Sequence, residues 1–334
     1  MIFAPSRDSI GLRTNDPVSG SSDAFNKNGL CGNASHSTAR IALLLRIRGG
    51  AETYNHFRVT ADRMRPPMHG ATTTFASPGL AVQVRSVTRR FDNGVIALDG
   101  LDLDVPTGQF LAILGPSGCG KSTLLRLIAG LDQPQAGSVH VAQNDSSRTS
   151  VAYVFQDAHL LPWRTVLQNV ALPLELMHAT RDRRTEEAFK AIEMVGLSDA
   201  MHCYPSQLSG GMRMRVSLAR AMITHPALLL LDEPFAALDE ITRQRLDEQL
   251  RELWRTSRTT VIFVTHSTAE AVFLAQRAVV LSRRPGRIVL DRAIELPDDR
   301  PASIRATPHF AAQTKAIYEA LDSGSGPALR SDPA

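Results

Sequence analysis

The sequence predicts an α/β fold built on a mostly parallel β-sheet. From residue 80 onward, short apolar runs alternate with longer amphipathic runs, which is the pattern of strands that alternate with helices. Several of the short runs are apolar on both faces, as expected for central parallel strands covered by helices. An apolar content of 43% over 334 residues is enough to bury a sizeable core.

The elements follow in chain order. Residues 1–80 are rich in Ser, Gly, Asn, Thr and Arg without a sustained period, so we expect a disordered N-terminal extension. A helical pattern occupies about 166–206, including 186–195, and forms a compact insertion. The tail after residue 292 is predicted to hold one helix at 308–321. The predicted strands span 81–87, 110–114, 151–155, 227–231, 261–265 and 278–281.

Charge and cysteine content limit the possible partners. The net charge of +4 lies entirely in the first 80 residues, and the remainder is neutral. A neutral folded region lacks the electrostatic attraction that dominates binding to nucleic acids, so we expect no nucleic-acid partner. Three scattered cysteines indicate neither a disulfide framework nor a zinc site. Uninterrupted apolar runs reach only five residues, far below the ~20 of a membrane-spanning helix.

A glycine-rich loop follows the predicted strand 110–114 and opens an apolar-periodic helix. Its pattern is GxxxxGK[ST] in the context of strand, loop and helix, which binds nucleotide phosphates through backbone N–H groups. Lys121 is predicted to reach the β- and γ-phosphates, and the Ser122 hydroxyl to ligate Mg²⁺. The helix N-terminus also suggests a lowered thiol pKa for Cys119. The predicted phosphate-binding residues are Gly115, Pro116, Ser117, Gly118, Cys119, Gly120, Lys121, Ser122 and Thr123.

Polar side chains follow three other predicted strands. Asp232 and Glu233 end the run 227–231, Gln156 follows 151–155, and His266 follows 261–265. Carboxyl ends of parallel strands meet at one edge of the sheet, where ligands bind. An acidic pair alone would equally well cap a helix, but beside the phosphate loop Asp232 is expected to hold the metal ion. Glu233 is then expected to polarise the attacking water, a role worth about 10² to 10⁴ in rate.

A second potential phosphate site stands at Ser209, Gly210 and Gly211. This segment precedes a helical pattern through 216–222, so its N–H groups and the serine could bind an anion. On its own, a capped turn is the simpler interpretation.

In order and spacing these motifs resemble the nucleotide-binding domain of ABC transporters. The separations are 35 residues from Lys121 to Gln156, 23 from Ser209 to Asp232 and 34 from Asp232 to His266. The resemblance covers about 81–291. It implies an α/β P-loop NTPase cassette with a central mostly parallel sheet, an antiparallel β subdomain and a small helical subdomain at about 157–210. Residues 292–334 would then form a short C-terminal tail.

The resemblance also implies a mechanism. ATP and Mg²⁺ would bind between two copies of the chain, with the loop of one copy facing Ser209 to Gly211 of the other. Phe91 matches the aromatic residue that stacks on adenine, and Asp239 matches the acidic residue that communicates across the homodimer. Gln156 would sense the nucleotide and ligate the metal together with Ser122 and Asp232, while His266 would assist Glu233 in hydrolysis.

The segment from Phe155 to Val166, with its Leu-Leu-Pro-Trp, looks like the importer branch for nitrate, sulfonates and taurine. The Asp-Ala before it looks most like aliphatic sulfonate importers, with taurine and nitrate as alternatives. Such subunits work with a separate permease dimer and an extracytoplasmic solute-binding protein. This implies a peripheral location on the cytoplasmic face of the inner membrane.

Two other classes are disfavoured. A soluble cassette ATPase of DNA repair or translation usually carries a long coiled-coil insertion or two cassettes, whereas only about 50 residues separate Gln156 from Leu208 and the motifs occur once. A nucleotide-binding scaffold without turnover would be expected to lack Glu233 or His266, and both are present.

Overall fold

The structure is a computed structural model that describes residues 79–142, 151–236 and 238–324. All of them belong to one of two units of the chain, Ala71–Ala334. The predicted disordered extension therefore lies outside the described residues, apart from its last two positions. Among the described helices, none is both long and apolar enough to cross a bilayer.

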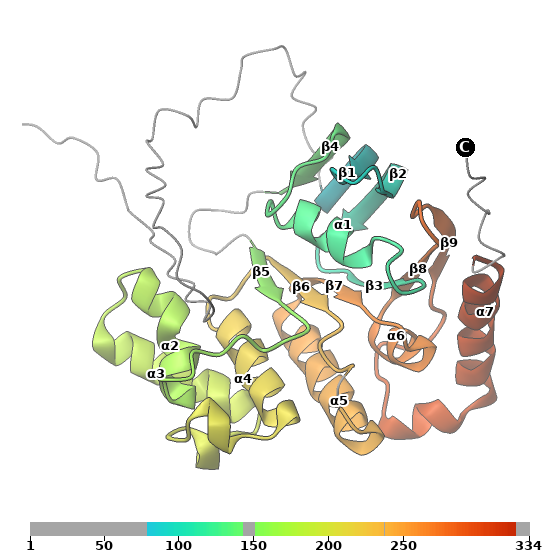
Figure 1. Cartoon of the computed structure of the whole chain (residues 1–334). Coiled ribbons are helices and arrows are strands. Elements are labelled where there is room, and N and C mark those ends of the chain that lie inside the picture. The colour runs from blue at the N-terminus through green and yellow to red at the C-terminus, as the bar shows by residue number, and fades with distance from the viewer. Residues whose placement is uncertain (1–78, 143–150, 237, 325–334) are drawn as a thin grey trace, which may run out of the picture. The chain divides into compact units, whose positions relative to one another are not determined.

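A six-stranded sheet forms the centre of this unit (Figure 1). Its strand order is β5-β6-β7-β3-β8-β9, and every pair is parallel except β8 with β9. Five of the six strands coincide with predicted strands to within one residue at each end, which confirms the mostly parallel sheet. The strands are β3 (Phe110–Leu114), β5 (Val151–Val154), β6 (Leu228–Asp232), β7 (Thr260–Val264), β8 (Arg277–Leu281) and β9 (Ile288–Ala293).

A separate three-stranded antiparallel sheet has the order β2-β1-β4. It consists of β1 (Leu80–Arg90), β2 (Ile96–Pro106) and β4 (Ala136–Val141). Only β1 was predicted as an individual strand. The sheet itself agrees with the predicted antiparallel β subdomain.

The helices divide into two groups. Helices α2, α3 and α4 lie together beside the sheet and share a small core, as the predicted helical subdomain requires (Figure 1). Short 3₁₀ turns occur at Ser198–Ala200, Pro205–Gln207 and Ala302–Ala306. The helices are α1 (Lys121–Ile128), α2 (Val166–Leu176), α3 (Arg181–Met194), α4 (Gly210–Met222), α5 (Glu240–Ser257), α6 (Thr268–Leu274) and α7 (Pro308–Gly324).

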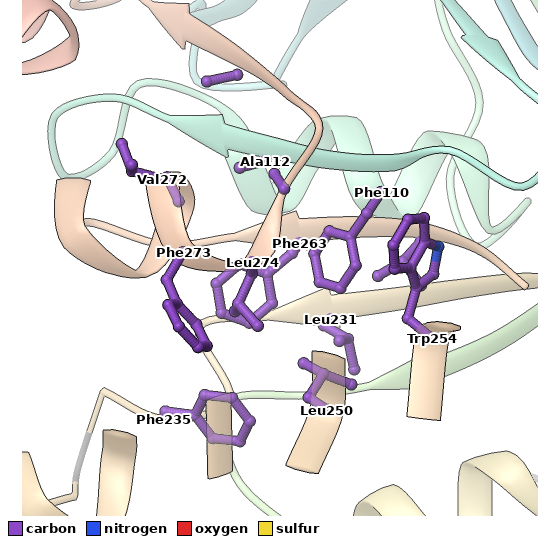
Figure 2. Packing of buried hydrophobic residues seen from close by; sticks show 14 of the residues in the cluster. Phe110, Ala112, Leu231, Phe235, Leu250, Trp254, Phe263, Val272, Phe273 and Leu274 are labelled. Atoms are coloured by element: carbon purple, nitrogen blue, oxygen red, sulfur yellow. The ribbon is translucent and has the colours of Figure 1, made fainter. Parts of the chain in front are cut away.

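Strand β3 divides the core because all five of its side chains are buried. Phe110, Ala112 and Leu114 face the cluster that includes α5, α6 and α7, and the alternate residues face α1 and the antiparallel sheet. The Phe110 ring meets the ring of Trp254 edge-on, with 5.9 Å between centroids (Figure 2). Burial on both faces fixes the position of the strand that carries the glycine-rich loop.

Candidate functional site

The loop between β3 and α1 depends on glycines at points of close backbone approach. A Cβ on Gly115 would lie 2.7 Å from Cys119 Sγ and 2.9 Å from the Leu281 carbonyl oxygen. A Cβ on Gly120 would lie 2.8 Å from the carbonyl oxygen of Ala97. The loop therefore packs against the end of β8 and the start of β2, which leaves the N–H groups at the start of α1 to face an anion.

Lys121 lies at the first position of α1 with its side chain 5% exposed. Its ammonium donates hydrogen bonds to the carbonyl oxygens of Gly115 (2.9 Å) and Pro116 (3.2 Å) and lies 3.6 Å from Glu233 Oε1. Through these two hydrogen bonds the loop keeps the positive charge of Lys121 next to its own backbone. Phosphate oxygens are stronger acceptors for an ammonium group than these carbonyls, because they are charged.

Asp232 is buried at the end of β6 and accepts two hydrogen bonds. Ser122 Oγ donates to Oδ1 and the Tyr153 hydroxyl donates to Oδ2, each at 3.0 Å. Burial raises the pKa of Asp232, and these two bonds oppose the rise because they stabilise the carboxylate. Burial and the charge of Asp232 also raise the pKa of Tyr153, which keeps the phenol protonated as a donor.

Glu233 stands between two basic side chains. Its Oε1 lies 3.6 Å from Lys121 Nζ, and its Oε2 lies 3.7 Å from His266 Nδ1. Its backbone N–H donates to the Val264 carbonyl at 3.0 Å, which joins the end of β6 to the end of β7. His266 follows β7 and its side chain is 58% exposed, so it borders solvent while Glu233 is only 23% exposed.

The ends of β6, β7 and β3, which are neighbours in the sheet, thus bring Lys121, Asp232, Glu233 and His266 together. Gln156 lies beyond the end of β5, which is the outermost strand on one side of the sheet and the neighbour of β6. Its side chain is exposed and makes no hydrogen bond to any other described residue. The grouping can hold a polyphosphate beside a carboxylate that can accept a proton from water.

The donor set suits a magnesium ion that is bound partly by phosphate. The Ser122 hydroxyl and the Asp232 carboxylate lie 3.0 Å apart and supply the hard oxygen ligands that Mg²⁺ prefers. Among the described residues, no group of three or more His, Cys, Asp or Glu side chains could hold a metal alone. A magnesium ion here would need phosphate oxygens and water to complete its coordination.

Ser209, Gly210 and Gly211 form a capped turn at the start of α4. The Ser209 hydroxyl accepts a hydrogen bond from the N–H of Met212 at 3.2 Å. A Cβ on Gly211 would lie 3.2 Å from Thr242 and 3.4 Å from Leu238, so the turn packs against the start of α5. Within the described residues, no hydrogen bond or ion pair connects this turn to the phosphate loop.

Asp239 caps α5 and Phe91 stands in the turn between β1 and β2. Asp239 accepts a hydrogen bond from the N–H of Thr242 at 3.0 Å, and this bond lowers its pKa. Phe91 is 39% exposed, and the guanidinium of Arg89 lies 5.2 Å from its ring centroid. The strand that leaves this turn contains Ala97, which contacts the phosphate loop.

The prediction for the Cys119 thiol was wrong. The side chain is 1% exposed, and burial raises its pKa. The charge of Lys121 opposes this effect but is the smaller influence. A helix N-terminus favours a thiolate only where the sulfur is not buried in the core.

Sequence analysis missed two residues that contact this site. Tyr153 lies inside β5, where an aromatic residue is expected for packing alone. Its hydroxyl donates a hydrogen bond to the Asp232 carboxylate. A Cβ on Gly118 would lie 3.1 Å from Nη2 of Arg284, which places that guanidinium against the phosphate loop. The basic run after the predicted strand 278–281 was the available signal for Arg284.

The family model of the ABC transporters matches residues 98–236 of this chain. The chain is 46% identical over 221 residues to the aliphatic sulfonates import ATP-binding protein SsuB 1 of Mesorhizobium japonicum, covering 66% of this chain and 81% of the relative. It is 42% identical over 263 residues to SsuB 1 of Burkholderia cenocepacia, covering 78% and 79%. An uncharacterized ABC transporter ATP-binding protein of Methanocaldococcus jannaschii is 47% identical over 226 residues, covering 66% and 85%.

Solved structures give the same fold. A dimeric ATP-binding cassette in a post-hydrolysis state with ADP and phosphate bound is 31% identical and has a TM-score of 0.58. The match covers 65% of this chain and 100% of that one. A putative metal-chelate type ABC transporter in an inward-facing conformation is 28% identical with a TM-score of 0.56, covering 63% and 82%. The predicted cassette fold is confirmed.

Proposed function

This chain belongs to the ABC transporter family of ATP-binding proteins, and from that premise we propose that it hydrolyses ATP to energise import of a small oxyanion through a separate permease. The observation that carries the proposal is the placement of Glu233 between Lys121 and His266, beside the Asp232–Ser122 pair. This arrangement supports hydrolysis because it joins a phosphate-binding cation to a carboxylate base.

In the proposed reaction, Lys121 exchanges the carbonyls of its own loop for the β- and γ-phosphates of ATP. Glu233 orients the attacking water and accepts its proton, and His266 holds the other side of that carboxylate. Ser122 and Asp232 would hold Mg²⁺, which neutralises developing phosphate charge when bound. Gln156 is proposed to complete this metal site by a movement of the segment after β5.

We propose that the working unit is a head-to-tail homodimer. Ser209 and Gly210 are exposed, and the described residues make no bond between this turn and the loop of the same chain. ATP between the loop of one protomer and this turn of its partner would close both sites at once. Phe91 is the proposed adenine platform, and Asp239 the proposed contact across the dimer.

The proposed partners are a permease dimer in the inner membrane and an extracytoplasmic solute-binding protein. A groove of about 610 Å³ on the helical group is lined by Trp163, Leu167 and Thr185, among others, and Trp163 is 69% exposed. An exposed tryptophan at a groove supports docking of a permease segment there. The protein would then lie on the cytoplasmic face, with residues 81–291 as the cassette and 292–334 as a short tail.

Aliphatic sulfonates are the first proposed solutes, with taurine and nitrate as alternatives. Several relatives above 40% identity are named for aliphatic sulfonate import, and the Leu-Leu-Pro-Trp segment supports the same branch. A deletion strain should lose growth on alkanesulfonates as sole sulfur source and recover with the intact gene. Normal growth on sulfonates together with loss on nitrate or taurine would reassign the solute.

The variant Glu233→Gln tests the proposed base. It keeps the side-chain volume but removes the proton acceptor, so ATP should still bind while hydrolysis falls by ~10² or more. Because closure would then not be followed by hydrolysis, ATP should also trap a dimer, visible by size-exclusion chromatography. Glu252→Gln, at an exposed position near the end of α5, is the matched control and should retain turnover. Undiminished hydrolysis in Glu233→Gln would refute the assigned role.

A further inference from the structure

We propose that Arg243 and Glu270 form a positioning clamp that fixes His266 and the Leu238–Asp239 segment relative to each other. The proposal rests on the proposed ATPase function and deepens it. Neither residue belongs to the motifs found in the sequence, and neither contacts Lys121 or the phosphate loop through any bond of the described residues. Their contacts instead connect two segments that border the site.

Arg243 holds the segment before α5. Its Nη2 donates a hydrogen bond to the Leu238 carbonyl at 2.7 Å, and its backbone N–H donates to the Asp239 carbonyl at 2.9 Å. Its Nη1 also reaches Glu240 at 3.1 Å, on the solvent side. The side chain of Leu238 packs against Gly211, so the guanidinium supports the contact between this segment and the capped turn at the start of α4.

Glu270 holds the segment that carries His266. One carboxylate oxygen lies 3.3 Å from Nε of Arg243, and the other accepts a short hydrogen bond from the Thr265 hydroxyl. The Thr265 hydroxyl oxygen in turn accepts from the N–H of Ser267 at 3.0 Å. His266 therefore stands between two residues whose positions depend on Glu270.

The link between the two residues is an ion pair without a hydrogen bond, and it lies in a poorly solvated part of the fold. Glu270 is 7% exposed and Arg243 is 21% exposed in this ion pair, so water screens it only weakly. Burial raises the pKa of Glu270, while the bond from Thr265 and the charge of Arg243 oppose the rise. A buried carboxylate loses much of its solvation, and removing its partner leaves it uncompensated. A small shift at one end of the pair should therefore move the other end.

A second close pair involves α5 and makes no hydrogen bond or ion pair to either clamp residue, although the charges of Glu270 and Arg243 act on its carboxyl group. Arg305 lies 3.3 Å from Asp247, with side chains 14% and 3% exposed, and its guanidinium stacks 3.5 Å from the ring centroid of Phe273. This pair joins α5 to the turn before α7 and makes no bond to Leu238 or to Thr265. A purely structural role would give the two pairs the same effect on activity.

The experiment compares Arg243→Ala, Arg243→Lys and Glu270→Gln with Arg305→Ala in the full-length protein. Each is measured for ATP affinity by calorimetry, for kcat of ATP hydrolysis and for the midpoint of thermal unfolding. We expect the Arg243→Ala and Glu270→Gln variants to lose ~10-fold or more in kcat with ATP affinity within ~3-fold, because Lys121 and its loop are untouched. Arg305→Ala should stay within ~2-fold of the wild-type kcat even where its unfolding midpoint falls equally.

A double variant completes the test. If the two residues act as one unit, Arg243→Ala with Glu270→Gln should lose no more kcat than the worse single variant. Arg243→Lys should restore only part of the activity, because an ammonium cannot reach both partners in the geometry of a guanidinium. It also replaces Arg243→Ala if the latter fails to fold.

Three results would overturn the clamp: equal kcat losses in Arg243→Ala and Arg305→Ala, affinity losses that match the kcat losses, or additive effects in the double variant. The outcome is distinguishable from failure of the proposed function. If the wild-type protein hydrolyses ATP and Glu233→Gln does not, while the clamp variants behave as the control does, only the clamp is refuted.

Discussion

The backbone of Glu233 adopts a conformation that few side chains tolerate. Its φ is 47°, in the left-handed region, and such residues cost of order 1–3 kcal/mol unless the surroundings enforce them. Here the N–H bond to Val264 and the flanking Lys121 and His266 fix the geometry. The fold thus accepts strain at the residue whose carboxylate stands between Lys121 and His266, which is typical of a functional site.

Cys119 should be protected from alkylation in the native protein. Because burial raises its thiol pKa, little thiolate exists at pH 7, and its reaction with iodoacetamide should be at least ~10-fold slower than that of the more accessible Cys203. The rate at Cys119 should rise as the pH is raised above the ordinary thiol range. Peptide mass spectrometry of timed samples measures both sites. Equal rates in native protein, rather than only after unfolding in urea, would contradict the burial argument.

Tyr153→Phe should weaken the response to magnesium. The change removes one of the two donors to Asp232, so the carboxylate pKa should rise further and its affinity for a cation should fall. Loss of a hydrogen-bond partner of a metal ligand typically costs about 10- to 100-fold in metal affinity, so the Mg²⁺ concentration for half-maximal ATP hydrolysis should increase by about 10-fold or more. Tyr204→Phe, at an exposed tyrosine, is the control. If the magnesium titration were unchanged, Tyr153 would not contribute to the proposed magnesium site.

At the scale of elements, two-sided burial decided which strands could be predicted. β3 and β7 are continuous apolar runs that the core surrounds, so composition alone marks them. β2, β4 and β9 escaped prediction because they are partly exposed: Asp99, Asp102 and Asp104 interrupt β2, and β9 alternates intermediate and exposed positions. Their pairing partners, which no local pattern encodes, define them as strands.

Asn169 should prove essential to the segment before α2. The residue is fully buried, and its side chain accepts from the N–H of Leu161 and donates to the carbonyls of Leu161, Arg164 and Thr165 at 2.8–3.1 Å. Asn169→Leu preserves volume but leaves these groups without partners, so the free energy of unfolding should fall by about 2–4 kcal/mol. Urea denaturation measures the loss, and proteolysis near Trp163 should become faster.

The matched control is Asn93→Ala, in an exposed turn where the side chain accepts one hydrogen bond from Val95. It should change stability by less than about 0.5 kcal/mol. If Asn169→Leu were as mild as this control, the amide would not be what organises the segment.

At the scale of the whole molecule, the parallel sheet explains why much of the site was predictable. Strand ends that lie far apart in sequence meet at one edge, so Lys121, Asp232 and His266 could be grouped from their positions after apolar runs. Arg243, Glu270 and Arg284 could not, because their contacts depend on how α5, α6 and the β8–β9 turn pack in three dimensions. The turn at Ser209 could be found only as a motif, since no bond among the residues that the structure describes joins it to the loop.

Packing at the same scale places an acid where water cannot reach it. Asp247 on α5 is 2% exposed, its Oδ1 has no hydrogen-bond partner among the described residues, and burial with the nearby charge of Glu270 raises its pKa to about 8. Arg305 opposes the rise and does not cancel it. In the unfolded chain the same carboxyl titrates near 3.8.

Asp247→Asn should therefore change how stability depends on pH. Between about pH 4 and pH 8 the folded wild type binds more protons at this site than the unfolded chain, so its stability falls as the pH rises, by at most about 1.4 kcal/mol per pH unit. Asparagine does not titrate, so the free energy of unfolding of the variant should rise relative to that of the wild type as the pH increases across this window. Above about pH 8 the difference between the two proteins should stay constant. Urea denaturation at pH 5, 6, 7 and 8 measures the difference. Glu248→Gln, which alters the exposed neighbour paired with the same Arg305, is the control. A difference for Asp247→Asn that stays flat over the window would mean that the carboxyl is already ionised in the fold.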